Sequence, residues 1–229
     1  MYVPTTPALA AQPLAPAGIV ASEGAAPPAP VETALPGSVE TILSVRRAVL
    51  NVLDGQAASV AGTLLADSPA SAGRRVGLAG RIVSLQRHGL WGWRTIAGTH
   101  TGPGGRYRLR YRPRHVGSER LRVAFAGAAG DHGARRAVGR LNVYRLAEAS
   151  WYGGGGSLAC GGWLTGSTLG VASKTLPCGT RVTLRYRGRT VRVRVIDRGP
   201  YVAGREFDLT EATKRALSFE GVGVVWVAD

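Results

Sequence analysis

The sequence predicts an all-β protein with two folded parts that follow an N-terminal segment without regular structure. In runs such as Tyr107–Tyr111, apolar residues alternate with arginine, a period of two that is typical of half-buried strands. Turn-forming residues such as Asp54-Gly55 separate these runs. We therefore expect a disordered segment over 1–44, one β domain over 45–146 and a second over 147–229.

The first segment is rich in alanine and proline, and no helical or strand periodicity survives its prolines. It fits either an extended spacer through a cell envelope or a remnant of processing. No basic region precedes an apolar core, so the export expected below needs a signal that has been removed or lies upstream. No stretch approaches the roughly 18 apolar residues that a membrane-spanning helix needs, and we expect none.

The second segment holds about seven short strands in a hundred residues, which favours an Ig-like β-sandwich. It contains no cysteine, so an antibody-type disulfide is excluded. The expected strands cover residues 48–53, 59–65, 81–86, 93–97, 107–111, 120–125 and 141–144.

Positive charge is concentrated after residue 45. That part carries all 29 basic residues and 11 acidic ones, a net charge of +18. Such a balance predicts attraction to polyanions, among them an anionic wall polymer, nucleic acid or an anionic membrane surface. An equally simple explanation is a coding preference for arginine, with the charges solvating strand faces. No nucleic-acid-binding motif accompanies the arginines, so we expect no nucleic-acid partner.

Aromatic and histidine residues of the second segment give weaker signals. Trp91 and Trp93 fit either a sugar-stacking platform or core positions, and we favour the core. The four histidines of the chain lack the close spacing of metal ligands, and we expect neither a metal nor a cofactor. This domain is therefore expected to act as a spacer or a binding module, not as a catalyst.

The last eighty or so residues carry several motifs in a fixed order: ASWYG at 149–153, LGVA at 169–172, KTLPCGT at 174–180, VIDRGPY at 195–201 and FDLT at 207–210. Together they resemble the RlpA-like double-psi β-barrel family, which is related to expansins. The resemblance implies a six-stranded barrel in an extracellular or cell-envelope protein that acts on peptidoglycan or another wall polysaccharide. We expect a monomer.

The resemblance also implies site residues. Asp197 would be the general acid/base and Asp208 a second acid in the glycan groove. Each has a local alternative, because Asp197 fits an Asx-turn and Asp208 or Thr210 fits the cap of a helix that runs to about Leu217. Substrate contacts are expected from Trp151, Tyr152, Ser173, Arg198 and Tyr201.

Two cysteines stand in this domain, at Cys160 and Cys178. In an otherwise cysteine-free, glycine-rich chain they favour a disulfide suited to an exported protein; two buried free thiols are the alternative.

The sequence departs from the family pattern at two points. The Gly161-Gly162-Trp163 loop supplies no acid, and Ser173 stands where active relatives have histidine. Residues 146–229 contain no histidine, which excludes a Ser/His or Cys/His nucleophilic site and an internal zinc site there. Three hypotheses remain: a lytic transglycosylase, an expansin-like binding or wall-loosening module without turnover, and a structural domain whose arginines bind anionic wall polymer.

Overall fold

The structure is a computed structural model that describes residues 39–68, 73–128 and 130–229. The disorder predicted for residues 1–44 falls outside this range up to residue 38. It is wrong for residues 41–44, which begin a β-strand, Thr41–Val49. The described part is built from β-strands, with one short helix, α1 (Glu211–Leu217), and one 3-10 turn, η1 (Pro103–Gly105). The all-β prediction is confirmed.

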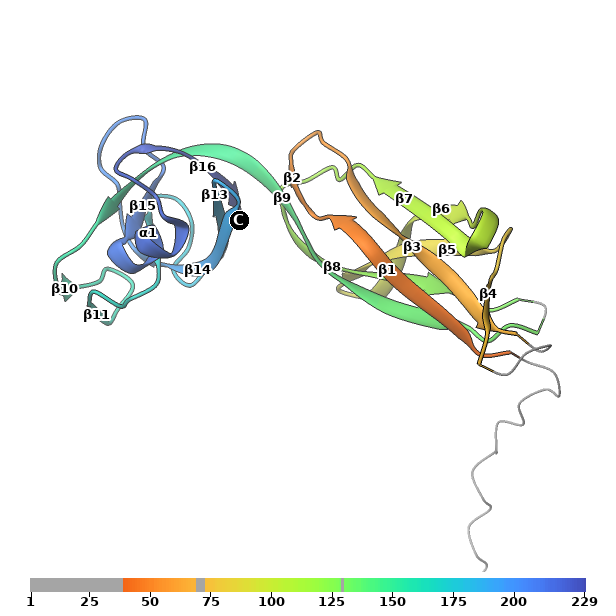
Figure 1. Cartoon of the computed structure of the whole chain (residues 1–229). Helices are drawn as coiled ribbons and strands as arrows, with labels where there is room; N and C mark the ends of the chain where they lie inside the picture. Colours follow the sequence, from red (N-terminus) through yellow and green to blue (C-terminus); the bar gives the residue numbers. More distant parts are fainter. Residues whose placement is uncertain (1–38, 69–72, 129) are drawn as a thin grey trace, which may run out of the picture. The chain divides into compact units, whose positions relative to one another are not determined.

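Two sheets make up the first folded part (Figure 1). One contains β1 (Thr41–Val49), β3 (Ala58–Asp67), β4 (Arg75–Gly77) and β7 (Arg106–Tyr111). The other contains β2 (Asn51–Leu53), β5 (Ile82–Gly89), β6 (Gly92–His100), β8 (Gly117–Phe125) and the first half of β9 (Ala134–Tyr152). One apolar cluster draws on both, with Leu64 from β3 and Leu121 from β8 among its members. Burial of these alternate side chains stabilises the pair of sheets.

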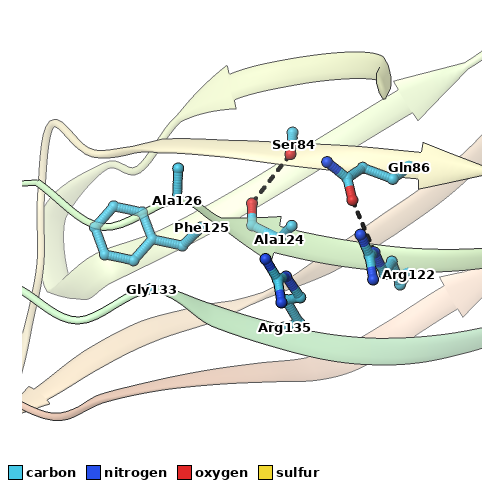
Figure 2. A pocket seen from close by; sticks show the side chains of 8 residues that line it. All are labelled: Ser84, Gln86, Arg122, Ala124, Phe125, Ala126, Gly133 and Arg135. Carbon is cyan, nitrogen blue, oxygen red and sulfur yellow. Dashed lines mark hydrogen bonds between the residues drawn. The ribbon is translucent and has the colours of Figure 1, made fainter. Parts of the chain in front are cut away.

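All seven strands expected in this part coincide with observed ones, the first of them divided between β1 and β2. β1 begins at Thr41, earlier than the expected boundary at residue 45. The expectation of a core position is wrong for Trp91, which lies in the β5–β6 turn and is 92% exposed. Trp93 is half-buried, and the guanidinium of Arg122 lies 4.2 Å from its ring centroid. Arg122 belongs to the outward-facing polar side chains of β5, β8 and β9 (Figure 2).

The second part is a closed barrel of six strands, as the resemblance implied. Its members are the second half of β9, β12 (Val171–Ser173), β13 (Arg181–Tyr186), β14 (Arg189–Asp197), β15 (Phe207–Thr210) and β16 (Gly223–Ala228). They pair in the order β15-β12-β14-β13-β16-β9, and pairing of β15 with β9 closes the ring. β12 is parallel to β14 and β15 is parallel to β9, while the remaining pairs are antiparallel.

Alternation along the strands fills the barrel. Val193 and Val195 of β14, Phe207 and Leu209 of β15 and Leu184 of β13 are buried in one apolar cluster. β13 and β14, in which apolar residues alternate with arginine, form an antiparallel hairpin across Arg187-Gly188. A small hairpin of β10 (Gly156–Ser157) and β11 (Trp163–Leu164) stands outside the ring.

β9 belongs to both parts. Its first half pairs with β8, and the residues from Arg145 onward pair with β16 and then with β15. The predicted domain boundary at 146–147 therefore lies inside a continuous 19-residue strand. Among the described residues, no helix has the length and apolar character to cross a bilayer.

Candidate functional site

Four residues of neighbouring barrel strands stand in one row. Ala172 of β12 is opposite Asp197 of β14 on one side and opposite Asp208 of β15 on the other. Asp208 in turn is opposite Ser150 of β9. Because neighbouring strands lie about 4.8 Å apart, the Cα atoms of the two aspartates are separated by about 10 Å. Ala172, whose small side chain is buried, stands between them.

Asp197 reaches this row because the register of β14 shifts. Val171 is opposite Val195, but Ala172 is opposite Asp197, so Ile196 is an extra residue in β14. Strict alternation after Val193 and Val195 would turn position 197 into the barrel; the bulge turns it outward instead. Gly170 makes room for the bulge, since a Cβ there would lie 2.2 Å from Cδ1 of Ile196.

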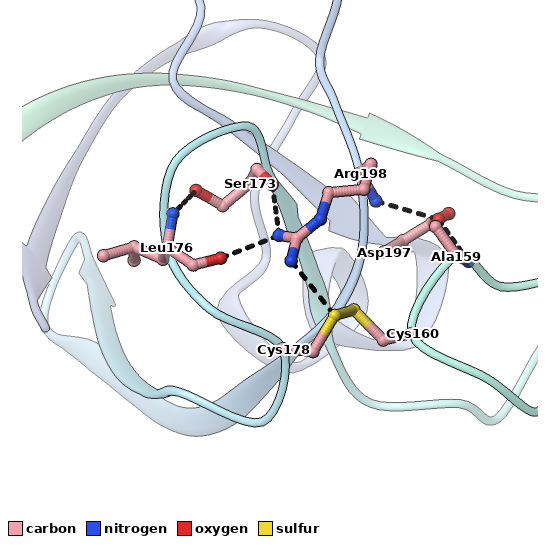
Figure 3. The surroundings of a disulfide bond; sticks show 7 residues. All are labelled: Ala159, Cys160, Ser173, Leu176, Cys178, Asp197 and Arg198. Carbon is pink, nitrogen blue, oxygen red and sulfur yellow. Dashed lines mark hydrogen bonds between the residues drawn. A yellow bond between two sulfur atoms is a disulfide. The ribbon is translucent and has the colours of Figure 1, made fainter.

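The carboxylate of Asp197 is oriented by backbone groups (Figure 3). Its Oδ1 accepts hydrogen bonds from the N–H groups of Ala159 and Arg198, both at 2.9 Å. Asp197 thus holds two loops together. Its local bond goes to the N–H of the next residue, whereas an Asx-turn would use the N–H of Gly199, two residues on. Because both bonds go to Oδ1, Oδ2 is the oxygen that remains to meet a ligand.

Asp208 lies in a different environment. Its Oδ1 accepts a 2.8 Å hydrogen bond from Ser150 Oγ. Burial raises the pKa of Asp208 above its ordinary value, and the charge of Asp197 adds to this, while Ser150 and Arg205 act in the opposite direction. Thr210, not Asp208, caps helix α1 by accepting from the N–H of Thr213.

Tyr152 brings a hydroxyl to the same face, two residues beyond Ser150. Its Oη is buried and has no hydrogen-bond partner of good geometry among the described residues. Burial, followed by the charge of Asp197, raises the pKa of Tyr152, so the hydroxyl keeps its proton. The interaction with Asp197 acts in the same direction, so the hydroxyl is placed to donate to Asp197 or to a ligand bound beside it.

The predicted disulfide is confirmed. Cys160 and Cys178 are bonded, with their Cα atoms 5.6 Å apart. The guanidinium of Arg198 points away from Asp197, toward the loop that contains Cys178 (Figure 3). It donates to the carbonyls of Ser173 at 3.0 Å and Leu176 at 2.7 Å and to Cys178 Sγ. In this structure Arg198 stabilises the loop beside the row of aspartates.

The remaining expected contact residues fall into two groups. Ser173 is fully buried, and its hydroxyl accepts from the N–H of Leu176. Tyr201, four residues beyond Asp197, is 82% exposed, and Trp151 is partly exposed with Lys214 Nζ 3.7 Å from its ring centroid. Trp163 is a further exposed aromatic residue, on β11, the strand that follows the loop contacting Asp197.

Two site features are not predicted from the sequence. Ser150 lies in the ASWYG motif, and its period-two spacing from Tyr152 is the signal that places both side chains on one face. The sequence gives no comparable signal for Trp163. Among the described residues, no three histidine, cysteine or acidic side chains gather as a metal site would require.

Comparison with known proteins identifies the family to which the barrel is similar. Residues 146–228 match a family model described as "Lytic transglycolase". A "Probable endolytic peptidoglycan transglycosylase RlpA" of Synechocystis is 42% identical over 105 residues, which cover 40% of this chain and 33% of the relative. The C-terminal domain is an RlpA-like double-psi β-barrel. The match leaves the first folded part of the chain largely unassigned.

Other relatives extend the same assignment. A protein of Aquifex aeolicus with the same description is 32% identical over 117 residues, 49% of this chain and 50% of its own length. An "Endolytic peptidoglycan transglycosylase RlpA" of Rickettsia bellii is 36% identical over 87 residues, 34% of this chain and 38% of its own. The chain therefore spans between a third and a half of the length of these relatives.

One solved structure, the Streptomyces papain inhibitor, aligns with 26% identity to 38% of this chain and 94% of its own, with a TM-score of 0.31. So low a score carries no argument about this protein.

Proposed function

We propose that the RlpA-like barrel acts on the glycan strands of peptidoglycan as a lytic transglycosylase, in the cell envelope. The observation that carries the proposal is the outward row in which Asp197 and Asp208 flank Ala172, with the hydroxyl of Tyr152 on the same face. The relatives named as peptidoglycan transglycosylases support the choice of substrate.

In the proposed reaction a single carboxyl group serves as acid and then as base. Asp197 donates its proton to the glycosidic oxygen as the bond from that oxygen to the anomeric carbon breaks. The C6 hydroxyl of the same N-acetylmuramyl residue then attacks the anomeric carbon and gives its proton to Asp197, which closes a 1,6-anhydro ring. No water is consumed, and the carboxyl returns to its starting state.

The neighbours of Asp197 have supporting roles in this proposal. Two backbone N–H groups hold Oδ1, so the carboxyl group is oriented before the glycan binds. Tyr152 keeps its proton and donates to the glycan or to Asp197. Asp208, whose pKa burial raises, is the second carboxyl group and orients the sugar through hydrogen bonds.

Turnover is expected to be slow. The acid and the histidine of active relatives are both missing, and each would stabilise charge in the transition state. Loss of one such preorganised contact commonly costs about 2–4 kcal/mol of barrier, or roughly a hundred- to thousand-fold in rate.

A second candidate is a binding or wall-loosening module without turnover. Ser173, which stands where active relatives have histidine, is buried, and residues 146–229 contain no histidine that could replace it. This lack of a histidine favours the candidate without turnover. In this case the exposed aromatic residues Tyr201 and Trp163 would stack on sugar rings. Trp151 alternates with Ser150 and Tyr152 along β9 and lies on the other face of the strand, next to Lys214.

We also propose that residues 45–146 form an Ig-like sandwich. Strands β1, β3 and β7 share one sheet, and β6, β5, β8 and β9 share the other. This division matches strands A, B and E and strands C′, C, F and G of immunoglobulin domains.

The two functional candidates differ in what they release from the wall. Denuded sacculi incubated overnight with catalytic amounts of the protein should release soluble 1,6-anhydro-muropeptides, which mass spectrometry detects, in proportion to incubation time. Protein that sediments with the sacculi but releases nothing beyond a heat-inactivated control would be a binding module. Protein that neither sediments nor releases product would contradict both candidates.

A further inference from the structure

A pocket of about 370 Å³ lies on the outer face of the β6-β5-β8-β9 sheet (Figure 2). Its floor is formed by small residues, because Ser84 of β5 is opposite Ala124 of β8. Arg135 of β9 is opposite Ala124 on the other side, and Arg122 lies two residues before Ala124 on β8. The two arginines are therefore diagonal neighbours, whose Cβ atoms are about 7–8 Å apart.

Arg122 is held in place before any ligand arrives. Its Nε donates a 2.8 Å hydrogen bond to Oε1 of Gln86, and its guanidinium lies over the ring of Trp93. Gln86 is itself tied to Thr95 on β6. These contacts use one face and one nitrogen of the guanidinium and leave its two terminal nitrogens free to donate into the pocket.

Among the described residues, no acidic side chain neutralises the positive charge of this pocket. No acidic residue is among the eight that line it. The nearby carboxylates are used elsewhere, since Glu119 pairs with Arg87 at 2.6 Å and Asp131 with Arg81 at 2.8 Å. Burial first, and the charge of Arg135 second, lower the pKa of Arg122, as expected for two cations that face each other without a counter-ion.

We propose that this pocket binds a phosphate group of an anionic cell-wall polymer. Two guanidinium groups that approach from different strands match a tetrahedral anion, whose oxygens point in several directions. One arginine fork already satisfies both oxygens of a planar carboxylate, so a carboxylate would leave the second arginine unpaired. The choice of a wall polymer over other polyphosphates rests on the proposed function of the barrel.

The test is binding of the full chain to a fluorescent poly(glycerol phosphate) oligomer, followed by anisotropy at constant ionic strength. The Arg122→Gln/Arg135→Gln variant should bind at least about tenfold more weakly, because two charge-assisted hydrogen-bonding groups are lost. The matched control is Arg110→Gln/Arg112→Gln, which removes the same charge from exposed positions on and after β7. It should weaken binding by less than about threefold through long-range attraction alone.

Other outcomes would overturn the proposal. Equal losses in both variants would mean that the whole basic surface attracts the polymer without a site. Polygalacturonate of equal charge, bound as tightly and with the same loss on Arg122→Gln/Arg135→Gln, would mean that phosphate is not selected. Tighter binding of single-stranded DNA of equal charge through the same two arginines would identify a nucleic-acid site instead.

A local reporter provides a second readout. Titration of the wild type with inorganic phosphate should shift the Trp93 indole N–H signal in a ¹H–¹⁵N spectrum, because Arg122 lies over that ring. Trp93→Phe assigns the signal, and an unmoved signal at saturating phosphate would contradict the site. Poly(glycerol phosphate) has no glycosidic bond, so it is not a substrate for the proposed reaction of the barrel. If the polymer does not bind this pocket, the proposed release of muropeptides by the barrel is unaffected. If the barrel releases no muropeptides, binding of the polymer to this pocket is unaffected.

Discussion

Two carboxyl groups on one face of the barrel differ in what surrounds them. Asp197 accepts two backbone N–H groups at one oxygen, whereas Asp208 accepts a single neutral hydroxyl from Ser150 and is half-buried. Burial opposes the charged form of Asp208 more than this hydrogen bond favours it, and its pKa is raised. The two carboxyl groups are therefore held by different contacts, and burial favours the protonated form of Asp208.

At the residue scale, Asp208→Asn should slightly stabilise the folded protein near pH 7. A folded-state pKa raised above the unfolded value means that the stability associated with the carboxyl is complete below about pH 4 and is lost as pH rises through the folded pKa. Asparagine avoids this loss, and its Oδ1 still accepts from Ser150. Because the group is only half-buried, the gain in Tm should be small, about 1–2 °C at pH 7.

Thermal unfolding of both proteins between pH 4 and pH 8 measures this difference. The two melting temperatures should converge as pH falls toward 4. A variant less stable than wild type at pH 7 would mean that attraction to Arg205 outweighs the cost of burial.

Part of this arrangement was accessible from the sequence. Alternation alone places Val193 and Val195 inside the barrel, and it places Asp208 outward between Phe207 and Leu209. The same rule applied to β14 would have buried Asp197. The bulge at Ile196 depends on the packing of Ile196 against Gly170 and on the hydrogen bond from Cys160, contacts between residues distant in sequence. No local pattern encodes them.

At the scale of elements, the end of β14 is clamped from two sides. The N–H of Cys160 donates to Ile196 at 3.2 Å, and the N–H of Gly179 donates to Val195 at 2.8 Å. The disulfide joins the two loops that provide these bonds. It therefore stabilises the bulge that turns Asp197 outward, in addition to closing a loop in the unfolded chain.

The Cys160→Ser/Cys178→Ser variant should lose about 3 kcal/mol of unfolding free energy, as expected for an 18-residue separation. Urea unfolding measures the loss. Amide exchange of residues 196–198 should quicken by more than that of β13, if the clamp holds the bulge. Wild-type protein denatured without reductant should show no free thiol, and two free thiols would contradict the bridge.

Strands and helices can be predicted from the sequence where the residue pattern and the burial agree. The alternation of apolar residues with arginine in β13 and β14 and the amphipathic pattern of α1 are such cases. β4 was missed because Arg75-Val76-Gly77 is too short and too exposed to show a period. The continuity of β9 was also missed, because Leu146 and Glu148 face solvent while Ala147 and Ala149 are buried but too small to signal a strand.

At the scale of the whole molecule, β9 links the two folded parts without an intervening loop. The backbone of residues 145–149 is paired with β16, so the side chain of Leu146 is exposed while its peptide bonds are held in a sheet. A strand shared in this way resists proteolysis, which needs a locally unfolded segment.

Limited proteolysis with chymotrypsin tests this property. Cleavage after Leu90 or Trp91, in the highly exposed β5–β6 turn, should precede cleavage after Leu146. Mass spectrometry of a time course gives the order of the cuts. Cleavage after Leu146 as the first event within residues 73–229 would mean that the two parts are joined by a flexible linker.

The role of Asp197 as acid and base is tested most directly by comparing wild type, Asp197→Asn and Asp208→Asn on denuded sacculi, with mass spectrometry for 1,6-anhydro-muropeptides and sedimentation for binding. We predict slow release by wild type, a reduction of about 10²–10⁴-fold in Asp197→Asn with sacculus binding retained, and a smaller reduction in Asp208→Asn. Equal release by wild type and Asp197→Asn, or loss of release only in Asp208→Asn, would contradict the assignment of Asp197 as the acid and base.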